Sequence, residues 1–207
     1  MGCSLEQEER LRASGCTAIA GIDEAGRGPL AGSVVAAAVI LPPAYSLLGL
    51  DDSKKLTAAK RFRFRNEIIA DPRICWALGS ASIEEIDRLN ILRATHEAMR
   101  RAVQALNQHP DHALIDGLPV HPFPIAQTAL VGGDHISLSI AAASVLAKVF
   151  RDEEMLEWDR LFPQYHFAAH KGYGTALHLS KLQEYGPCPA HRKSFSPVAQ
   201  AYLPFSQ

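Results

Sequence analysis

The chain has 207 residues, of which 47% are hydrophobic, and a formal net charge of −1 at pH 7. This size suits one sizeable core, and the near-neutral charge excludes a protein that binds nucleic acid through its overall charge alone. We therefore expect a single domain over residues 1–207. The four cysteines are widely scattered and form no C-x-x-C pair, which argues against a zinc site and against a disulfide framework.

The sequence offers no membrane or secretion signal. The first residues, MGCSLEQEERLR, are charged and lack the apolar stretch of a signal peptide. The longest apolar runs, such as residues 34–41, are too short to cross a bilayer. We expect a cytoplasmic protein without membrane contact, and nothing in the sequence demands more than a monomer.

Runs of apolar residues bounded by turn residues predict an α/β fold. In chain order, we expect strands at 17–22 and 33–41, a helix at 57–70, and a strand at 74–81. A helix should follow at 82–108, with strands at 113–116 and 125–131, and helices at 139–161 and 175–185. Ser82 and Glu85 form a capping box, Asn90 marks a restart of that helix, and Gly186 ends the last one. The first turns of 139–161, SIAAASVLA, are nearly all small, which lets a helix approach a sheet closely.

Acidic residues stand at the ends of predicted strands. Asp23 and Glu24 close an apolar strand, Asp116 closes another before Gly117, and Asp134 follows Gly132-Gly133. Adjacent strand residues face opposite sides, so one of the first pair can enter a site while its neighbour reaches round from the other face. Carboxylates gathered at one sheet edge raise one another's pKa unless a cation intervenes, and oxygen ligands suit Mg²⁺ or Mn²⁺. Asp116 or Asp134 alone is more typical of a turn cap, but no turn needs both Asp23 and Glu24.

Other motifs are weaker. The Gly21 to Gly26 spacing lacks the Lys-Ser/Thr of a phosphate-binding loop, and Gly26-x-Gly28 leads into a strand, unlike a dinucleotide fingerprint. His166 and His170 lack the glutamate of an HExxH zinc site, and we expect them at the surface or facing nucleic acid. Basic residues cluster at 54–65 and, with four histidines, at 165–193. Each cluster alone is typical of a solvated helix face, although such clusters also form phosphate-facing patches.

An ordered set of short motifs resembles the bacterial ribonuclease HII family. The matching segments are GIDEAGRGPLAG (21–32), DSKKL (52–56), DG (116–117), GGD (132–134), SIAAASVLAKVFRD (139–152), HKGYGT (170–175) and HRKSFSPV (191–198). Each is weak alone, but they follow the family order from about Ala18 to Val198. Two departures are minor: Gly132 stands where lysine is common, and Leu118 where asparagine is frequent.

The resemblance implies a ribonuclease H-like fold, with a mixed five-stranded sheet flanked by helices. It implies a catalytic core at about 18–200 and a helical C-terminal part at about 163–207. It also implies four catalytic and metal-binding carboxylates, namely Asp23, Glu24, Asp116 and Asp134. They would hold two Mg²⁺ or Mn²⁺ ions, one lowering the pKa of the attacking water and the other stabilising the leaving 3′-oxygen. Asp152 is expected to be structural.

The family's activity is cleavage of the RNA strand of RNA–DNA hybrids, including nicking on the 5′ side of single ribonucleotides embedded in duplex DNA. The products carry a 5′-phosphate and a 3′-hydroxyl, and the role is ribonucleotide removal. By resemblance, Gly26, Arg27 and Gly28 sense the 2′-hydroxyl, and Tyr173 stacks on the neighbouring sugar at the RNA–DNA junction. Lys54, His191 and Arg192 are expected to contact phosphate.

Four alternatives stay open at this point. Ribonuclease HIII carries a separate N-terminal substrate-binding domain, whereas only some 17 residues precede the first strand here. A DNA nuclease of the wider fold would not need the glycine–arginine–glycine loop. A binding module without catalysis would not need the acids, and a small-molecule phosphatase would not need the basic 165–193 segment.

Overall fold

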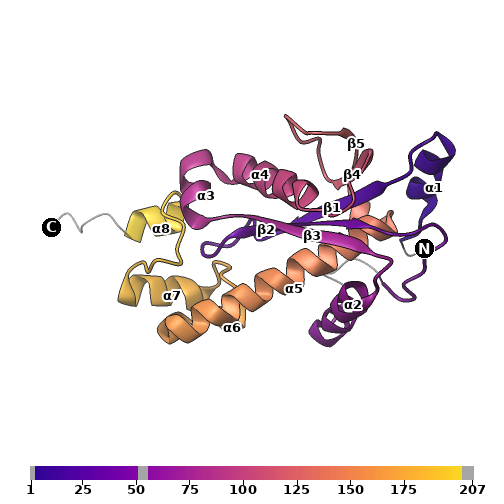
Figure 1. The fold of residues 1–207 in the computed structure, drawn as a ribbon. Helices are drawn as coiled ribbons and strands as arrows, with labels where there is room; N and C mark the ends of the chain where they lie inside the picture. Colours follow the sequence, from indigo (N-terminus) through magenta and orange to yellow (C-terminus); the bar gives the residue numbers. More distant parts are fainter. Residues whose placement is uncertain (1–2, 51–55, 202–207) are drawn as a thin grey trace.

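A mixed five-stranded sheet forms the centre of the protein (Figure 1). The computed structural model describes residues 3–50 and 56–201. The strands are β1 (Ile19–Ala25), β2 (Val34–Ile40), β3 (Cys75–Ala81), β4 (His112–Asp116) and β5 (Ala126–Leu130). Their order in the sheet is β3-β2-β1-β4-β5; β1 pairs antiparallel with β2 and parallel with β4. This confirms the predicted fold class, and all five predicted strands are present within two or three residues of the expected bounds.

Helices cover both faces of this sheet. The α-helices are α1 (Glu6–Ala13), α2 (Ala58–Ala70), α3 (Ile83–Leu89), α4 (Ile91–Gln104), α5 (Leu138–Leu161), α6 (Phe167–His170), α7 (Ala176–Tyr185) and α8 (Ser196–Ala201). Two short 3₁₀ helices are η1 (Gly133–His135) and η2 (Pro163–Tyr165). Helices α3 and α4 lie on one face, α2 and α5 on the other, and α6 to α8 form a group at one end (Figure 1).

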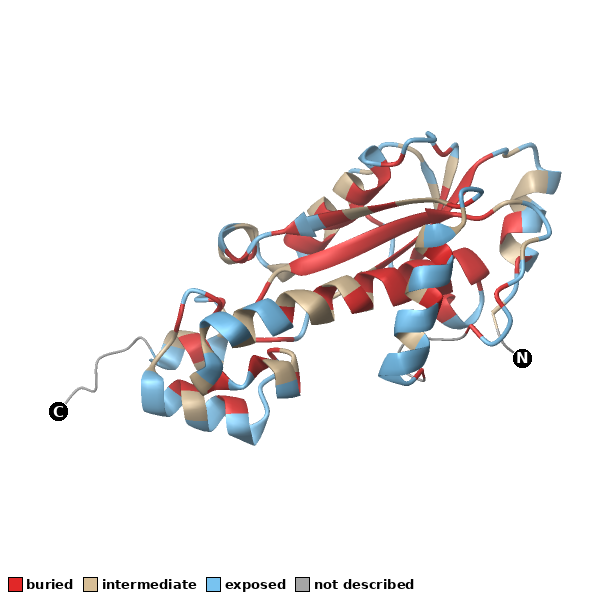
Figure 2. Cartoon of the chain, turned by 60° about the horizontal axis from the view of Figure 1, so that its bottom comes forward, coloured by how far each residue is buried: buried red, intermediate tan, exposed pale blue. Residues whose placement is uncertain are grey.

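Alternation along β2 divides the core between the two faces. Ala36 and Ala38 pack in the cluster that contains Ala98 of α4, whereas Ala37 and Val39 pack in the cluster with the first turns of α5. Every residue of β2 is buried, and the half of α5 next to the sheet is buried on nearly all sides (Figure 2). The period of two in a strand thus lets one strand supply two cores.

Helix α5 approaches the sheet very closely at Gly21. A Cβ added there would lie 2.2 Å from the carbonyl carbon of Ser139 and 2.3 Å from the amide nitrogen of Ile140. Helix α5 therefore rests directly on the backbone of β1, as its small first turns predicted. Because side chains alternate, Asp23 lies on the same face as Gly21 and points toward α5.

Local signals fix the bounds of the helices around residue 90. Ser82 and Glu85 make the predicted capping box, in which each side chain accepts the other residue's backbone N–H. Asn90 adopts a φ of 72°, which separates α3 from α4, and its side chain accepts the N–H of Arg93. The predicted restart at Asn90 is therefore confirmed.

The N-terminal helix α1 was not predicted, because its sequence EQEERLRA carries no apolar stripe. Its docking residue is Glu8, which is fully buried. Glu8 Oε1 accepts hydrogen bonds from Ser137 Oγ at 2.6 Å, from Ser139 N at 3.0 Å and from Ser139 Oγ at 2.5 Å. A buried carboxylate thus fastens α1 to the first turn of α5. Within the part of the chain that the structure describes, no helix has the length and apolar character needed to cross a membrane.

Candidate active site

Two of the predicted carboxylates lie side by side on neighbouring parallel strands, Asp116 at the end of β4 and Asp23 two residues before the end of β1. Ile22 of β1 pairs with Ile115 of β4, so Asp23 and Asp116 follow at adjacent positions on the two strands. Asp23 is buried and Asp116 partly exposed. The next residue, Gly117, has a φ of 85°, a left-handed conformation that glycine adopts without strain, and the chain turns away there.

The third carboxylate comes from the short helix η1, just before α5. The backbone N–H of Gly133 donates to Asp116 Oδ1 at 2.6 Å, which ties η1 to the end of β4. The next residue, Asp134, is buried. One carboxylate oxygen each of Asp23, Asp116 and Asp134 lie within 4.8 Å of one another. Asp23 therefore shares one small site with Asp116 and Asp134, although more than 90 residues separate it from them in the sequence.

The electrostatics of this cluster are unfavourable without a cation. Burial, together with the neighbouring carboxylates of Glu24 and Asp116, raises the pKa of Asp23 well above its usual value. Hydrogen bonds from the Ser144 side chain and from the Glu24 N–H, the latter at 2.7 Å, oppose this shift. Buried like charges are costly unless they are paired or coordinate a metal.

The donor set fits a divalent cation. All three groups are carboxylates and their oxygens converge, while burial and the neighbouring carboxylates raise the pKa of Asp23. Hard oxygen donors of this kind suit Mg²⁺ or Mn²⁺. Asp23, Asp116 and Asp134 are therefore the residues that could hold such an ion.

Glu24 lies beside this cluster. Its Oε1 atom accepts a hydrogen bond from Arg27 Nη1 at 3.1 Å, and its side chain is 13% exposed. The Arg27 side chain is 51% exposed. Glu24 is thus close enough to raise the pKa of Asp23, but in this structure its own carboxylate is paired with Arg27.

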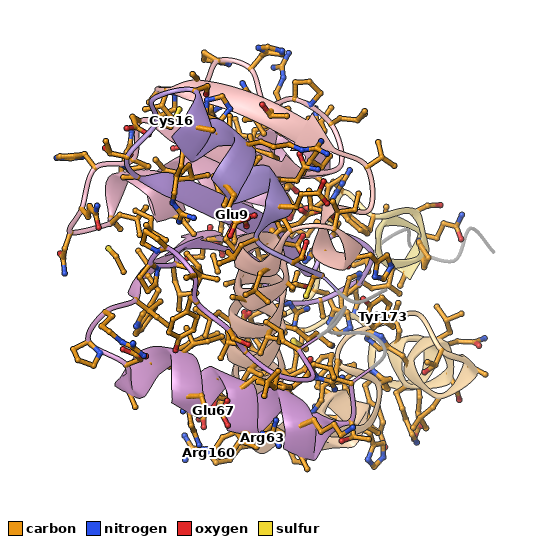
Figure 3. All side chains as sticks on the ribbon, turned by 90° about the vertical axis from the view of Figure 1, so that its right-hand side faces the viewer. Glu9, Cys16, Arg63, Glu67, Arg160 and Tyr173 are labelled. Atoms are coloured by element: carbon orange, nitrogen blue, oxygen red, sulfur yellow. The ribbon has the colours of Figure 1, made fainter. Side chains whose placement is uncertain are left out.

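One cleft brings the acids and the glycine-rich loop together. Its lining includes Asp23, Glu24, the loop 26–28 and Tyr173. A Cβ added to Gly28 would lie 3.5 Å from Cε1 of Tyr173, so the ring stands next to the loop. The Tyr173 side chain is half-exposed and lies beside the C-terminal helices (Figure 3). The cleft therefore joins Asp23 and Glu24 to the residues predicted to contact a sugar, and Asp23 connects it to the convergent carboxylates of Asp116 and Asp134.

The prediction that Arg192 contacts phosphate is wrong. Its side chain is completely buried, and its guanidinium donates five hydrogen bonds of 2.5–3.1 Å to backbone carbonyls. The acceptors are the carbonyl oxygens of Gly26, Arg27, Pro29, Gly32 and Ser33. Burial and the neighbouring Arg151 lower the pKa of Arg192 to about 9, which leaves it charged at neutral pH. Arg192 therefore supports the 26–33 loop from inside, together with Arg151, which donates to the carbonyl oxygens of Ala31 and Ser33.

The prediction for His191 is wrong for the same reason. His191 is 1% exposed, and its ring contacts His178 and the backbone N–H of Cys188. His170, expected at the surface or facing nucleic acid, is also buried and stacks on His178. The 165–193 segment therefore does not present its histidines as one basic face. Lys54 lies outside the described residues.

Sequence reasoning missed several polar residues of the cleft. Ser144, Lys148 and Lys171 line it together with Asp152. Lys148 Nζ donates to Asp152 Oδ1 at 2.6 Å, a pairing that occupies this acid. The sequence does contain a pattern that indicates them. Ser144, Lys148 and Asp152 are spaced four apart in a helix of mostly small apolar residues, so they share one face.

Comparisons with known proteins agree with this geometry. The family model for ribonuclease HII matches residues 20–198. A ribonuclease HII from Chlamydia caviae is 50% identical over 193 residues, which are 93% of this chain and 91% of that protein. The crystal structure of ribonuclease H2 from Pyrococcus horikoshii OT3 has the same fold, with a TM-score of 0.70 and 21% identity over 89% of this chain and 97% of that one.

Ribonuclease HIII has the same fold as this chain, but a smaller share of its length is matched. A crystal structure of the Bst enzyme in complex with Mn²⁺ has a TM-score of 0.70 at 18% identity. The match covers 89% of this chain but 68% of that one. The sequence match over most of the chain decides between these relatives: this chain belongs to the ribonuclease HII family, and its activity is that of a ribonuclease H.

Proposed function

We propose that this enzyme cuts the RNA strand of RNA–DNA hybrids and nicks on the 5′ side of single ribonucleotides embedded in duplex DNA. The products would carry a 5′-phosphate and a 3′-hydroxyl, and the role would be ribonucleotide removal from DNA. One observation carries this proposal: the carboxylates of Asp116 and Asp134 converge on that of Asp23, and Asp23 lines a cleft together with the bare 26–28 loop and Tyr173.

In this proposal the acids bind two Mg²⁺ or Mn²⁺ ions and the surrounding residues hold the substrate. Bound there, the cations would make water a nucleophile at neutral pH and balance the charge that develops on the leaving 3′-oxygen. Asp23, Asp116 and Asp134 would be the ligands, and Glu24, next to Asp23, would complete the negative frame. The Ser144 side chain and the Glu24 N–H hold Asp23 in one orientation.

Arg192 prepares the glycine-rich loop to contact a ribose. It draws the carbonyl oxygens of Gly26 and Arg27 inward. In a trans peptide the carbonyl and the following N–H point in opposite directions, so the N–H groups of Arg27 and Gly28 point away from Arg192. We infer that these donors meet the 2′-hydroxyl, the group that distinguishes RNA from DNA. Tyr173, next to Gly28, would stack on the neighbouring sugar.

Three duplexes test the substrate. Purified protein with Mg²⁺ should nick a DNA duplex with one embedded ribonucleotide on its 5′ side, cleave an RNA–DNA hybrid, and leave an all-DNA duplex intact. Cleavage of the all-DNA duplex would favour a DNA nuclease, and binding of the hybrid without product would favour a binding module.

Substitution of the acids tests the metal-binding assignment. Asp23→Asn or Asp116→Asn should lower the nicking rate by about 10³-fold or more, because each removes a charged ligand. Asp71→Asn, which changes an aspartate paired with Arg73 and Tyr45 outside the cleft, is the matched control and should cut at the wild-type rate. Full activity of Asp116→Asn would refute the assignment.

A small-molecule phosphatase needs a different test from the one that the sequence suggested. Arg192→Ala no longer separates the two functions, because it would remove an internal support rather than a surface contact. Tyr173→Ala is the better variant. It should weaken cleavage of the single-ribonucleotide duplex, and it should not change hydrolysis of a small phosphate ester if the protein were a phosphatase.

A further inference from the structure

Three buried histidines lie behind the cleft and have no role in the chemistry proposed above. His170, His178 and His191 are 8%, 0% and 1% exposed and pack against the rings of Tyr165 and Phe167. The rings of His170 and His178 stack with centroids 4.4 Å apart. Burial lowers the pKa of all three, to about 4 for His178 and His191, so they are neutral at physiological pH.

The hydrogen bonds of His191 and His178 fix which ring nitrogen donates and which accepts. The backbone N–H of Cys188 donates to Nδ1 of His191 at 3.0 Å, so the proton of this neutral ring is on Nε2. That Nε2–H faces Nε2 of His178 at 3.0 Å, which must accept it. His178 therefore carries its proton on Nδ1, and this N–H donates to the backbone carbonyl of Tyr173 at 2.9 Å. A directed chain runs from Cys188 to Tyr173.

A second ring holds the other side of the same turn. The N–H of Gly172 donates to Nδ1 of His170 at 3.2 Å, and His170 Nε2–H donates to the carbonyl of Tyr165 at 2.8 Å. The N–H of Tyr173 donates to the carbonyl of His170 at 3.0 Å. Both peptide groups of Tyr173 are thus held from inside, while its side chain stands half-exposed in the cleft against Gly28.

We propose that the His191–His178 hydrogen-bond chain is a positioning device that holds the Tyr173 ring at the distance from the 26–28 loop that a ribose requires. The inference rests on the proposed function, because it assumes that Tyr173 contacts the sugar next to the cut. A buried polar chain is costly to desolvate compared with apolar side chains of the same volume. The end point of the chain accounts for this cost: the last acceptor is the backbone carbonyl of Tyr173, the one aromatic residue among the described residues that line the cleft.

Two substitutions at His178 distinguish the effect of losing its Nδ1–H donor from the effect of losing the volume of its ring. His178→Phe keeps a ring of similar size but has no N–H for the Tyr173 carbonyl. His178→Asn is smaller but places an amide nitrogen near the position of Nδ1. If the hydrogen bond positions Tyr173, the Phe variant should impair substrate binding and the Asn variant should restore it, although Asn leaves a cavity and should be the less stable protein.

Steady-state kinetics on the single-ribonucleotide duplex give the readout. His178→Phe should raise KM about 10-fold with kcat within about twofold of wild type, and His178→Asn should stay within about threefold in KM. In a Tyr173→Ala background, His178→Phe should change KM less than about twofold, because the group that it positions is gone. Equal KM values for His178→Phe and wild type, or the same KM increase in both backgrounds, would overturn the inference.

The tautomers offer a test that needs no activity and no variant. Long-range ¹H–¹⁵N spectra of the wild-type protein should show His178 protonated on Nδ1 and His170 and His191 on Nε2. His178 protonated on Nε2 would break the chain and overturn the inference. Failure of the proposed function is distinguishable, since wild-type protein would then not nick the duplex at all, whatever the tautomers.

Discussion

Glycine has different roles at Gly21 and Gly28. At Gly21 it allows α5 to pack on the sheet, and at Gly28 it keeps the cleft wall free of a side chain beside Tyr173. At Gly21 a methyl group would overlap the backbone of α5, which cannot move without leaving the sheet. We expect Gly21→Ala to lower the free energy of unfolding by about 3 kcal/mol, measured by urea denaturation.

Gly28→Ala is the matched comparison. Its methyl group would meet only the Tyr173 ring, at 3.5 Å, an ordinary contact distance. Stability should change by less than about 1 kcal/mol, while KM for the single-ribonucleotide duplex rises because the methyl group enters the cleft. Unchanged stability of Gly21→Ala would contradict the close packing, and unchanged KM of Gly28→Ala would contradict the role of the loop.

Single residues also mark where sequence reasoning succeeded and where it could not succeed. Asp116 was placed correctly at the end of a strand, and Asp23 lies two residues before the end of β1, because the burial of a strand and the residues that stop it are local properties. The fate of Arg192 is not local. The local sequence around a basic residue does not distinguish an arginine that faces solvent from one that binds backbone carbonyls. Only the folded chain brings residue 192 under the 26–33 loop.

At the scale of elements, the attachment of α1 to α5 depends on one carboxylate. Glu8→Ala would remove the acceptor for the side chains of Ser137 and Ser139 and for one N–H at the start of α5. We expect a loss of about 2–4 kcal/mol in the free energy of unfolding, because buried donors would lose their partner.

The neighbouring Glu9 supplies the control for this prediction. It lies on the same helix but is exposed (labelled in Figure 3), so Glu9→Ala should change stability by less than about 0.5 kcal/mol. Thermal or urea unfolding of the two variants would show the difference. Equal stability of both would mean that the hydrogen bonds of Glu8 do not hold α1.

Elements with their own signals were predictable from the sequence. The strands came from apolar runs, and the break at Asn90 came from a capping residue within a helical pattern. Helix α1 was missed because its hydrogen bonds to α5 are made by a buried polar side chain, Glu8, which no hydrophobic pattern reveals. The helices α6 and α8 have only 4 and 6 residues, too short for a periodicity to appear.

At the scale of the whole molecule, the buried histidines predict how stability depends on pH. Burial lowers the pKa of His178 and His191 to about 4, whereas unfolded histidine titrates near 6.5. The unfolded chain thus binds more protons between these values, and the free energy of unfolding falls as the pH is lowered from 6.5 toward 4. We expect a loss on the order of 1 kcal/mol per histidine between pH 6.5 and 5, a range above most carboxylate titrations.

Urea unfolding at a series of pH values measures this slope. His178→Phe should flatten it, whereas His109→Gln, which changes an exposed histidine, should leave it unchanged. A wild-type slope no steeper than that of His178→Phe would show that the histidines are not neutral in the folded state. A single cooperative transition in the same experiment would support the prediction that residues 1–207 form one domain.

The position of Arg192 in the chain has a consequence for biosynthesis. All three clustered acids lie before residue 135, so a growing chain contains the complete carboxylate set long before the cation that shapes the 26–33 loop is added. A product truncated before residue 192 would keep its acids and Arg151 but lose five hydrogen bonds to carbonyl oxygens of the loop. We expect such a product to retain the ligand set while its loop lacks part of its internal support.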